Sequence, residues 1–278
     1  VGNYTFDTYL DYVQQGIYLW ENSPYVKNYP ELYFLNYVLF HRTNDEEIKP
    51  CRTYFWKKIK DKVQGKAMVE AALEINHWCA GEVMYQGTDM RTGSALEIYR
   101  SGVGRCGEEA VFVVNVMRSA GIPARPVYVP RWSHCDDNHA WVEVWCDGDW
   151  HYLGACEPEA VLDKGWFTNA ASRAMMIGSR WYDRAMPDEK VIGKDGMNRI
   201  INLLGKYAKT RWITITVEDL DGTPAAGAKV RAEVMNYGEF SPIAIMEADK
   251  NGCISFETGF GSLLICAVYD GAYGEKVI

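Results

Sequence analysis

The sequence predicts an α+β protein in which helices come first, antiparallel strands follow, and a small β-sandwich ends the chain. Three observations carry this prediction. Apolar residues recur at helical spacing between residues 4 and 82. Strand-like alternation follows in residues 125–154, and from Arg211 onward strand-like segments alternate with glycine turns about every ten residues. Helices that precede antiparallel strands along the chain are typical of the α+β class.

The predicted helical layer divides at prolines and glycines. Residues 4–41 predict two helices, because prolines interrupt one aromatic-rich pattern. The pattern is helical again from Tyr54 to about Glu82. A short helix is expected over "SALEIYRSG", residues 94–102.

Cys106 begins the next predicted helix. Gly102 and Gly104 bend the chain just before it. Apolar residues then recur at helical spacing, at Ala110, Val113, Val114 and Met117. "SAGIP" at residues 119–123 stops the helix. The sequence therefore places Cys106 at a helix N-terminus.

Three segments after this helix predict antiparallel strands, namely residues 125–130, 139–146 and 150–154. Asp147-Gly148 is expected to join the last two as a two-residue hairpin turn. A two-residue turn sets a register that pairs Trp145 with Trp150. The same register, continued along both strands, pairs His139 with Cys156. Residues 166–210 show no strand alternation, so we expect a connecting layer with a helix through Ile200 and Leu204.

Composition restricts the class of protein. Hydrophobic content of 48% and charged content of 24% over 278 residues are ordinary for a globular protein. A net charge of −8 argues against nucleic acid as a partner, since phosphates require basic residues. The chain lacks an apolar run of the roughly 20 residues that a transmembrane span requires. The eight cysteines form no C-x-x-C pair and do not fix the cellular compartment.

Cys106 and His139 are the candidate catalytic pair. A thiol attacks as the thiolate, which a helix N-terminus and a nearby imidazolium both stabilise. His139 opens a predicted strand after the polar loop "SHCDDN" and is suited to the base of a Cys/His hydrolase. Two other interpretations stay open. One is that Cys106 is a small buried residue; the other is a zinc site drawn from His134, Cys135, His139, Cys146 and Cys156.

Three segments together resemble the transglutaminase-like superfamily, which has a papain-like fold. They are "GVGRCGEEA", "GIPARPVYV" and "NHAWVEVWCDGDWHYLGACEPE", within a core of about residues 68–166. "RCGEEA", "GACE" and "KGW" are also similar to motifs of the peptide N-glycanases. The resemblance implies that Cys106 is the nucleophile, that His139 is the general base and acid, and that no cofactor or metal is required.

The resemblance also implies an aspartate at position 154, where this chain has Gly154. Three interpretations of this departure compete. A Cys/His dyad works alone, or a three-residue hairpin turn shifts the register and places Glu157 opposite His139, or catalysis is lost and a binding groove remains. Trp78 is a candidate oxyanion donor, as in some relatives, or else a core residue of its helix.

The resulting hypothesis is a thiol-dependent amide-bond enzyme, a peptidase, amidase or acyl transferase, acting on a peptide, protein or glycopeptide. The alternative is a non-catalytic module that binds a peptide or glycan. We expect two domains, a transglutaminase-like domain over 1–208 and a β-sandwich over 209–278.

The segment "DLDGTPAAGAKV", residues 219–230, resembles the opening of carboxypeptidase-regulatory or prealbumin-like modules. The resemblance implies an extracytoplasmic location, either secreted or in the cell envelope. The sequence begins without methionine and stops at "GEKVI". We therefore expect it to be a trimmed piece whose last module is truncated.

Overall fold

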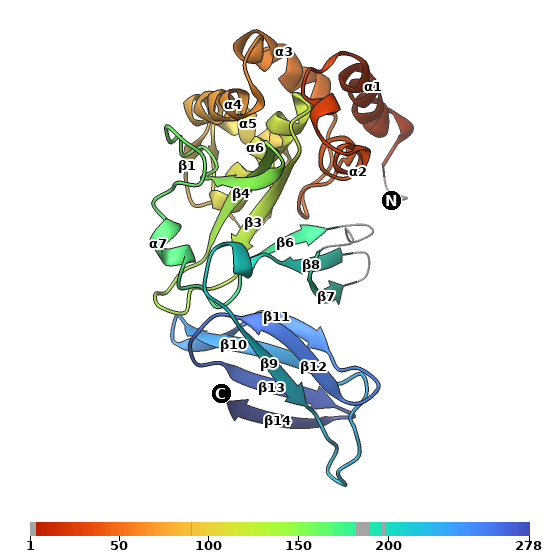
Figure 1. The fold of residues 1–278 in the computed structure, drawn as a ribbon, viewed down its shortest axis with the longest axis vertical. Coiled ribbons are helices and arrows are strands. Elements are labelled where there is room, and N and C mark those ends of the chain that lie inside the picture. Colours follow the sequence, from red (N-terminus) through yellow and green to blue (C-terminus); the bar gives the residue numbers. More distant parts are fainter. Residues whose placement is uncertain (1–3, 90, 182–188, 196–197) are drawn as a thin grey trace. The chain divides into compact units, whose positions relative to one another are not determined.

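The computed structural model describes residues 4–89, 91–181, 189–195 and 198–278. It divides into two compact units, Val1–Val127 with Ala140–Gly165 and Tyr128–His139 with Trp166–Ile278. The chain passes between the units three times, inside the strand that contains Val127, inside the strand that contains Ala140, and after Gly165. The predicted α+β class is confirmed (Figure 1).

Helices make up most of the first unit. They are α1 (Phe6–Asn22), η1 (Val26–Asn28), α2 (Glu31–Phe34), η2 (Leu35–Leu39), α3 (Arg52–Val63), α4 (Met68–Glu82), α5 (Ala95–Ser101) and α6 (Cys106–Ser119). The stretch expected to be helical from Tyr54 to Glu82 is two helices. It breaks at Gly65, whose φ of 74° a helix cannot contain.

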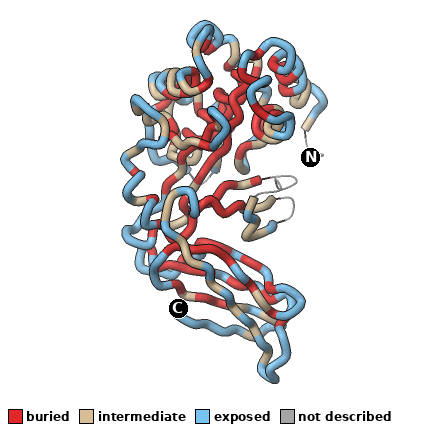
Figure 2. Tube along the Cα trace, viewed as in Figure 1, coloured by how far each residue is buried: buried red, intermediate tan, exposed pale blue. Residues whose placement is uncertain are grey.

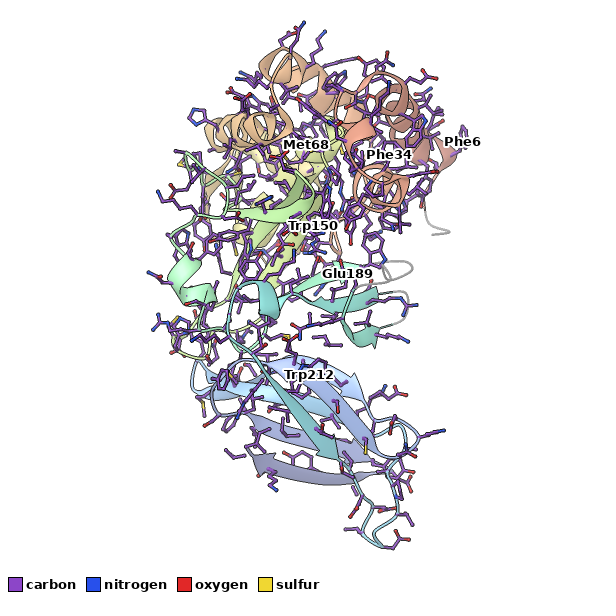
Figure 3. All side chains as sticks on the ribbon, viewed as in Figure 1. Phe6, Phe34, Met68, Trp150, Glu189 and Trp212 are labelled. Carbon is purple, nitrogen blue, oxygen red and sulfur yellow. The ribbon has the colours of Figure 1, made fainter. Side chains whose placement is uncertain are left out.

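The core of the first unit surrounds α6. Val111, Phe112 and Val113 on this helix are each 0% exposed. Every residue of α6 from Glu108 to Ser119 is buried, the polar ones included, and α3, α4 and α5 pack against the helix. Figure 2 shows buried backbone concentrated in the middle of this unit, and side chains such as Phe34 and Trp150 fill it (Figure 3).

The strands of the first unit follow the predicted register. β1 (Met84–Tyr85) pairs in parallel with β2 (Val103–Gly104), while β3 (Ala124–Val129), β4 (His139–Cys146) and β5 (Asp149–Leu153) follow α6. The turn between β4 and β5 has two residues, Asp147 and Gly148, with φ values of 52° and 92°. Trp145 pairs with Trp150, as expected, but the ladder ends at Val142 and Leu153 because residues 154–157 form a turn, so the expected pairing of His139 with Cys156 is wrong. The alternative three-residue turn, with its register shift, is therefore wrong.

In the second unit, the segment after β5 contributes strands where a helix was predicted. The elements are α7 (Thr168–Ala171), β6 (Gly178–Trp181), β7 (Val191–Asp195), β8 (Asn198–Asn202) and η3 (Leu204–Lys206). Ile200 and Ile201 belong to β8, which pairs with β6 and β7. The helix prediction here is wrong, because a short apolar run does not distinguish a helix from a paired strand. β6 also pairs with the end of β3, at Tyr128.

The remainder of the second unit is the predicted β-sandwich. Its strands are β9 (Arg211–Thr216), β10 (Lys229–Asn236), β11 (Glu239–Glu247), β12 (Cys253–Thr258), β13 (Leu264–Tyr269) and β14 (Ala272–Val277). One sheet has the order β11-β10-β13-β14 and the other pairs β12 with β9. Alternate residues of these strands are buried. Met175 and Met176, which precede β6, also belong to this core.

Across the part of the chain that the structure describes, every helix is too short or too polar to cross a membrane.

Candidate active site

Two glycines deliver the chain to Cys106. Gly102 ends α5 in the left-handed region, with a φ of 70°, where glycine is favoured. A Cβ added to Gly104 would lie 3.2 Å from the Cβ of Glu108 and 3.4 Å from Ile98 Cγ2. Gly104 therefore allows β2 to run close to the first turn of α6. Cys106 is the first residue of α6, as the sequence predicted.

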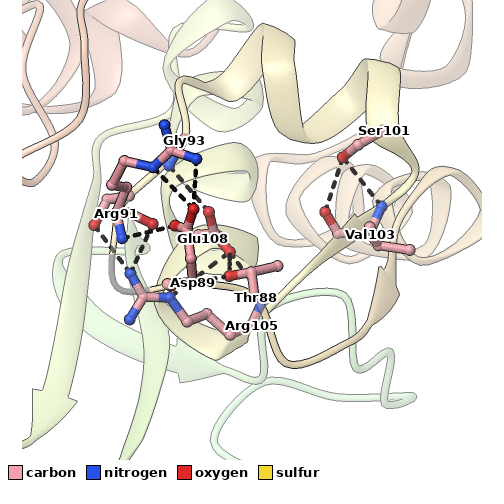
Figure 4. Close-up of polar contacts among 9 residues, drawn as sticks. Thr88, Asp89, Arg91, Gly93, Ser101, Val103, Arg105 and Glu108 are labelled. Carbon is pink, nitrogen blue, oxygen red and sulfur yellow. Dashed lines mark hydrogen bonds and ion pairs between the residues drawn. The ribbon is translucent and has the colours of Figure 1, made fainter.

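Glu108 secures the loop beside this helix N-terminus (Figure 4). Its Oε1 accepts the Gly93 backbone N–H at 3.0 Å, and its Oε2 accepts the Arg105 backbone N–H at 3.2 Å. The Thr88 hydroxyl also donates to Oε2. Arg105 Nη2 in turn donates to the Arg91 carbonyl at 2.9 Å. Glu108 therefore has a structural role, because it fixes Thr88 and Gly93 against the start of α6.

Cys106 differs from the other thiols of the first unit in its surroundings. It is half-buried at a helix N-terminus, where the helix dipole stabilises a thiolate. Burial instead raises the pKa of Cys51 to about 11 and that of Cys146 to about 12. Burial also raises the pKa values of Cys79 and Cys156 well above the ordinary range. Those four thiols are suited to packing and not to nucleophilic attack.

His139 belongs to the second unit and is held among aromatic rings. It is 6% exposed, and its ring lies 4.7 Å from that of Trp166 and 5.0 Å from that of Phe167. Burial lowers its pKa to about 4, against the opposing effect of Asp137. The imidazole is therefore neutral near pH 7, and burial makes it a weaker base than an ordinary histidine.

Asn236 of β10 anchors the loop that leads to His139. Its side chain is fully buried, and Nδ2 lies 3.0 Å from the carbonyl oxygen of Trp132, 2.9 Å from that of Cys135 and 3.3 Å from that of Asp137. The next backbone N–H, of Tyr237, donates to Asp136 Oδ1 at 2.6 Å. The β-sandwich thus fixes the backbone of residues 132–137. No motif in the sequence pointed to Asn236.

Gly154 and Glu157, two of the predicted site residues, lie together in the first unit. The Glu157 backbone N–H donates to the Gly154 carbonyl at 3.2 Å, which closes a four-residue turn. A Cβ added to Gly154 would lie only 2.3 Å from Glu157 Oε2 and 2.8 Å from Glu157 Cβ. The Glu157 side chain therefore fills the space that any side chain at position 154 would need.

Asn76 of α4 clamps this turn from the inside. It is 1% exposed, its Nδ2 donates to the Gly154 carbonyl at 2.9 Å, and its Oδ1 accepts the Cys156 backbone N–H at 3.0 Å. Cys156 has a φ of 57°, a left-handed conformation that non-glycine residues rarely adopt. No motif in the sequence pointed to Asn76, whose only signal was a polar residue between apolar positions of α4.

Glu109 lies one turn after Cys106 on α6 and is 3% exposed. Burial, followed by repulsion from Glu157 and Glu108, raises its pKa to about 8. Glu109 is therefore mostly protonated at pH 7. The repulsion between Glu109 and Glu157 also shows that the turn at 154–157 lies near the first turns of α6.

Trp78 packs in the first unit as a core residue would. Its ring stacks on Tyr99 with centroids 6.0 Å apart and contacts Phe112 at the same distance. These contacts favour the packing interpretation, and its role as an oxyanion donor stays a prediction. The zinc site considered from the sequence would need several ligands close together. Among the described residues, no three or more His, Cys, Asp or Glu side chains form a group that could hold a metal ion.

Solved structures with some likeness to this chain have low sequence identity. A proposed cysteine protease from Cytophaga hutchinsonii has 14% identity and a TM-score of 0.32, and the match covers 82% of this chain and 50% of that protein. A proposed protease from Parabacteroides distasonis has 14% identity and a TM-score of 0.35, and the match covers 62% of this chain and 29% of that protein. Red sea bream transglutaminase has 11% identity and a TM-score of 0.36, and the match covers 95% of this chain and 57% of that protein. This chain thus spans about half the length of the first of these proteins.

The family comparison gives the clearer result. No curated protein matches the chain. Residues 57–155 match the family model, and this range includes Cys106, His139 and Gly154. The resemblance predicted from the sequence is therefore confirmed for residues 57–155, which match the transglutaminase-like superfamily.

Proposed function

We propose that this protein is a thiol-dependent amide-bond enzyme in which Cys106 is the nucleophile and His139 is the general base and acid. The observation that carries the proposal is the position of Cys106, half-buried as the first residue of α6 within the segment that matches the family. The neutral imidazole of His139 adds support, since a base must be unprotonated to accept the thiol proton.

The proposed reaction has two steps. The thiol proton passes to the imidazole while Cys106 Sγ bonds to the carbonyl carbon of a peptide or carboxamide. The C–N bond then breaks, and the departing amine takes the proton from the imidazole. Water or a second amine next attacks the thioester, and Cys106 leaves as the thiol. Water makes the enzyme a peptidase or amidase, and an amine makes it a transferase.

A second candidate is a non-catalytic module that binds a peptide or glycan. Gly154 favours it, because glycine offers no carboxylate to orient an imidazole. This candidate predicts that Cys106 behaves as an ordinary thiol and that its replacement leaves peptide binding unchanged. The two candidates therefore differ in the chemistry of one sulfur atom.

Alkylation of the full chain by iodoacetamide tests the proposal. We expect Cys106 to react well below pH 8.5, about the pKa of a free thiol. The exposed Cys135 serves as an internal reference within the same molecule. Mass spectrometry of the two labelled peptides gives both rates as a function of pH. The His139→Ala variant should shift the Cys106 profile towards that of Cys135.

The control variant is His134→Ala, which removes an exposed histidine from the same loop and should change neither profile. Equal pH profiles for Cys106 and Cys135 in the unmodified chain would end the enzyme proposal. Glutamine-containing peptides, assayed with and without a primary amine, then separate hydrolysis from transfer. Cys106→Ala should lower either rate by about 10³-fold or more.

A further inference from the structure

The second unit contains an open groove that both apolar and basic side chains line. Its volume is about 1270 Å³, and every residue that lines it belongs to the second unit. Pockets for single small molecules are usually smaller, roughly 300–1,000 Å³. We propose that this groove binds an extended peptide segment that carries acidic and apolar side chains. The binding does not involve Cys106, which belongs to the first unit.

The first support is a set of large apolar side chains that stay exposed around the groove. Phe260 is 67% exposed, Val277 65%, Met235 52% and Phe240 47%. They come from β10, β11, β14 and the loop before β13, yet all four line the same groove. Exposed apolar side chains that share one hollow are typical of an interaction site, because a partner removes their surface from water.

The second support is the charge of the groove. Arg173, Lys206 and Lys209 line it, and they come from segments that precede the sandwich strands. Among the described lining residues, Glu233 is the only carboxylate, and it is buried and pairs with Arg231 at 3.0 Å. The groove is therefore positive, although the whole chain has a net charge of −8. A positive groove attracts an acidic ligand.

Arg173 exerts its charge within this groove. His134 also lines the groove, and desolvation followed by the charge of Arg173 lowers the pKa of His134. Across the described parts of the chain, neither Arg173 nor Lys209 forms an ion pair with a carboxylate. Both cations are therefore available to carboxylates of a ligand.

The third support is an open hydrogen-bonding position at the end of β10. This strand pairs with β13 only over Lys229–Glu233, while its pairing with β11 continues to Asn236. A two-residue turn with positive φ at both positions follows Asn236, so the backbone N–H and C=O of Asn236 point towards β11. Because these groups alternate in direction along an antiparallel strand, those of Met235 point away from β11. Met235 lines the groove, where a peptide main chain can pair with it.

An extended peptide combines the three chemistries that the groove offers. Its successive side chains point to opposite faces, so alternating acidic and apolar residues separate onto two faces. One face can then contact the exposed apolar side chains while the other meets the cations. Its main chain can add to the edge of β10, which a glycan or a lipid cannot do.

Fluorescence polarisation with the full chain tests the proposal. The probe is a fluorescein-labelled peptide of about ten residues in which glutamate and leucine alternate. We expect it to bind, and to bind about tenfold or more weakly when NaCl rises from about 50 mM to about 500 mM, because salt screens the charges. Peptides with lysine in place of glutamate, or with serine in place of leucine, should bind about tenfold or more weakly.

Two variants separate the contributions of charge and apolar surface. Arg173→Gln/Lys209→Gln should weaken binding about tenfold or more, because two cations are lost. Phe260→Ser should weaken it by about tenfold, because an apolar contact is lost. The matched controls are Lys250→Gln and Leu220→Ser, at exposed residues of the same unit outside the groove lining. Circular dichroism checks that every variant is folded.

Three outcomes overturn the proposal. The first is no binding of the glutamate–leucine peptide at about 1 mM. The second is an equal loss of binding in the groove variants and in their controls. The third is that dextran sulfate or phosphatidylglycerol vesicles bind through Arg173 and Lys209 while the peptide does not, which would assign the groove to another class of ligand. The measurement does not report on Cys106, so each of these outcomes leaves the proposed function untouched.

Discussion

Glu109 shows how one buried residue couples the site to the stability of the chain. Its pKa is about 8 in the folded protein, above the ordinary value of 4.5, because it is buried beside other carboxylates. Between these two values the folded state keeps a proton that the unfolded state has lost. The free energy of unfolding should therefore decrease as pH rises through this window, by at most about 1.4 kcal/mol per pH unit.

Glu109→Gln removes this titration and should be increasingly more stable than the unmodified chain as pH rises from 4.5 to 8. Urea unfolding at pH 5, 6.5 and 8 measures the difference. Glu31→Gln, at an exposed position in the first turn of α2, is the control and should give a constant difference. A constant difference for Glu109→Gln as well would contradict the raised pKa.

At the scale of elements, the hairpin of β10 and β11 does more than complete the sandwich. Asn236, at the end of β10, shares two amide protons among three carbonyl groups of the loop before His139. Each buried carbonyl that loses its donor costs about 1–3 kcal/mol. The hairpin thus restrains the backbone that presents the proposed base.

Asn236→Ala should increase amide hydrogen exchange in residues 132–138 by about tenfold or more, since 1.4 kcal/mol corresponds to a factor of ten. Exchange followed by mass spectrometry checks this directly. Asn251→Ala, at an exposed turn residue of the same sandwich, should leave those residues unchanged. Unchanged exchange in Asn236→Ala would show that other contacts hold the loop.

At the scale of the whole molecule, the second unit has a core that extends beyond the predicted sandwich. Met175 and Met176 are buried with the sandwich residues, and the Met175 carbonyl accepts the Thr258 hydroxyl at 2.7 Å. Lys190 pairs with Glu257 at 2.6 Å. The sequence-based boundary at residue 208 stays a prediction, and these contacts provide a way to test it.

A fragment of residues 166–278 should unfold at a higher temperature than one of residues 209–278. The shorter fragment loses two buried methionines, at about 2–5 kcal/mol for each truncated side chain. For a domain of this size, 1 kcal/mol shifts the unfolding temperature by about 4–8 °C. Differential scanning calorimetry compares the fragments. Equal unfolding temperatures would favour the boundary at 208.

The sequence by itself determined the features that depend on neighbours along the chain. The helical repeat and the glycines placed Cys106 at the start of α6, and Asp147-Gly148 set the hairpin register that pairs Trp145 with Trp150. These features are local, because hydrogen bonds and side-chain periodicity within a few residues produce them. The family match of residues 57–155 likewise followed from short ordered motifs.

Only the tertiary structure decided the features that join distant segments. Ile200 became part of a strand because β6 and β7 were available to pair with it. The Glu157 side chain lies over Gly154 because Asn76, on a helix far earlier in the chain, holds the turn. Asn236 holds a loop about a hundred residues before it. A buried polar group takes whichever partner packing brings to it, and sequence spacing does not reveal that partner.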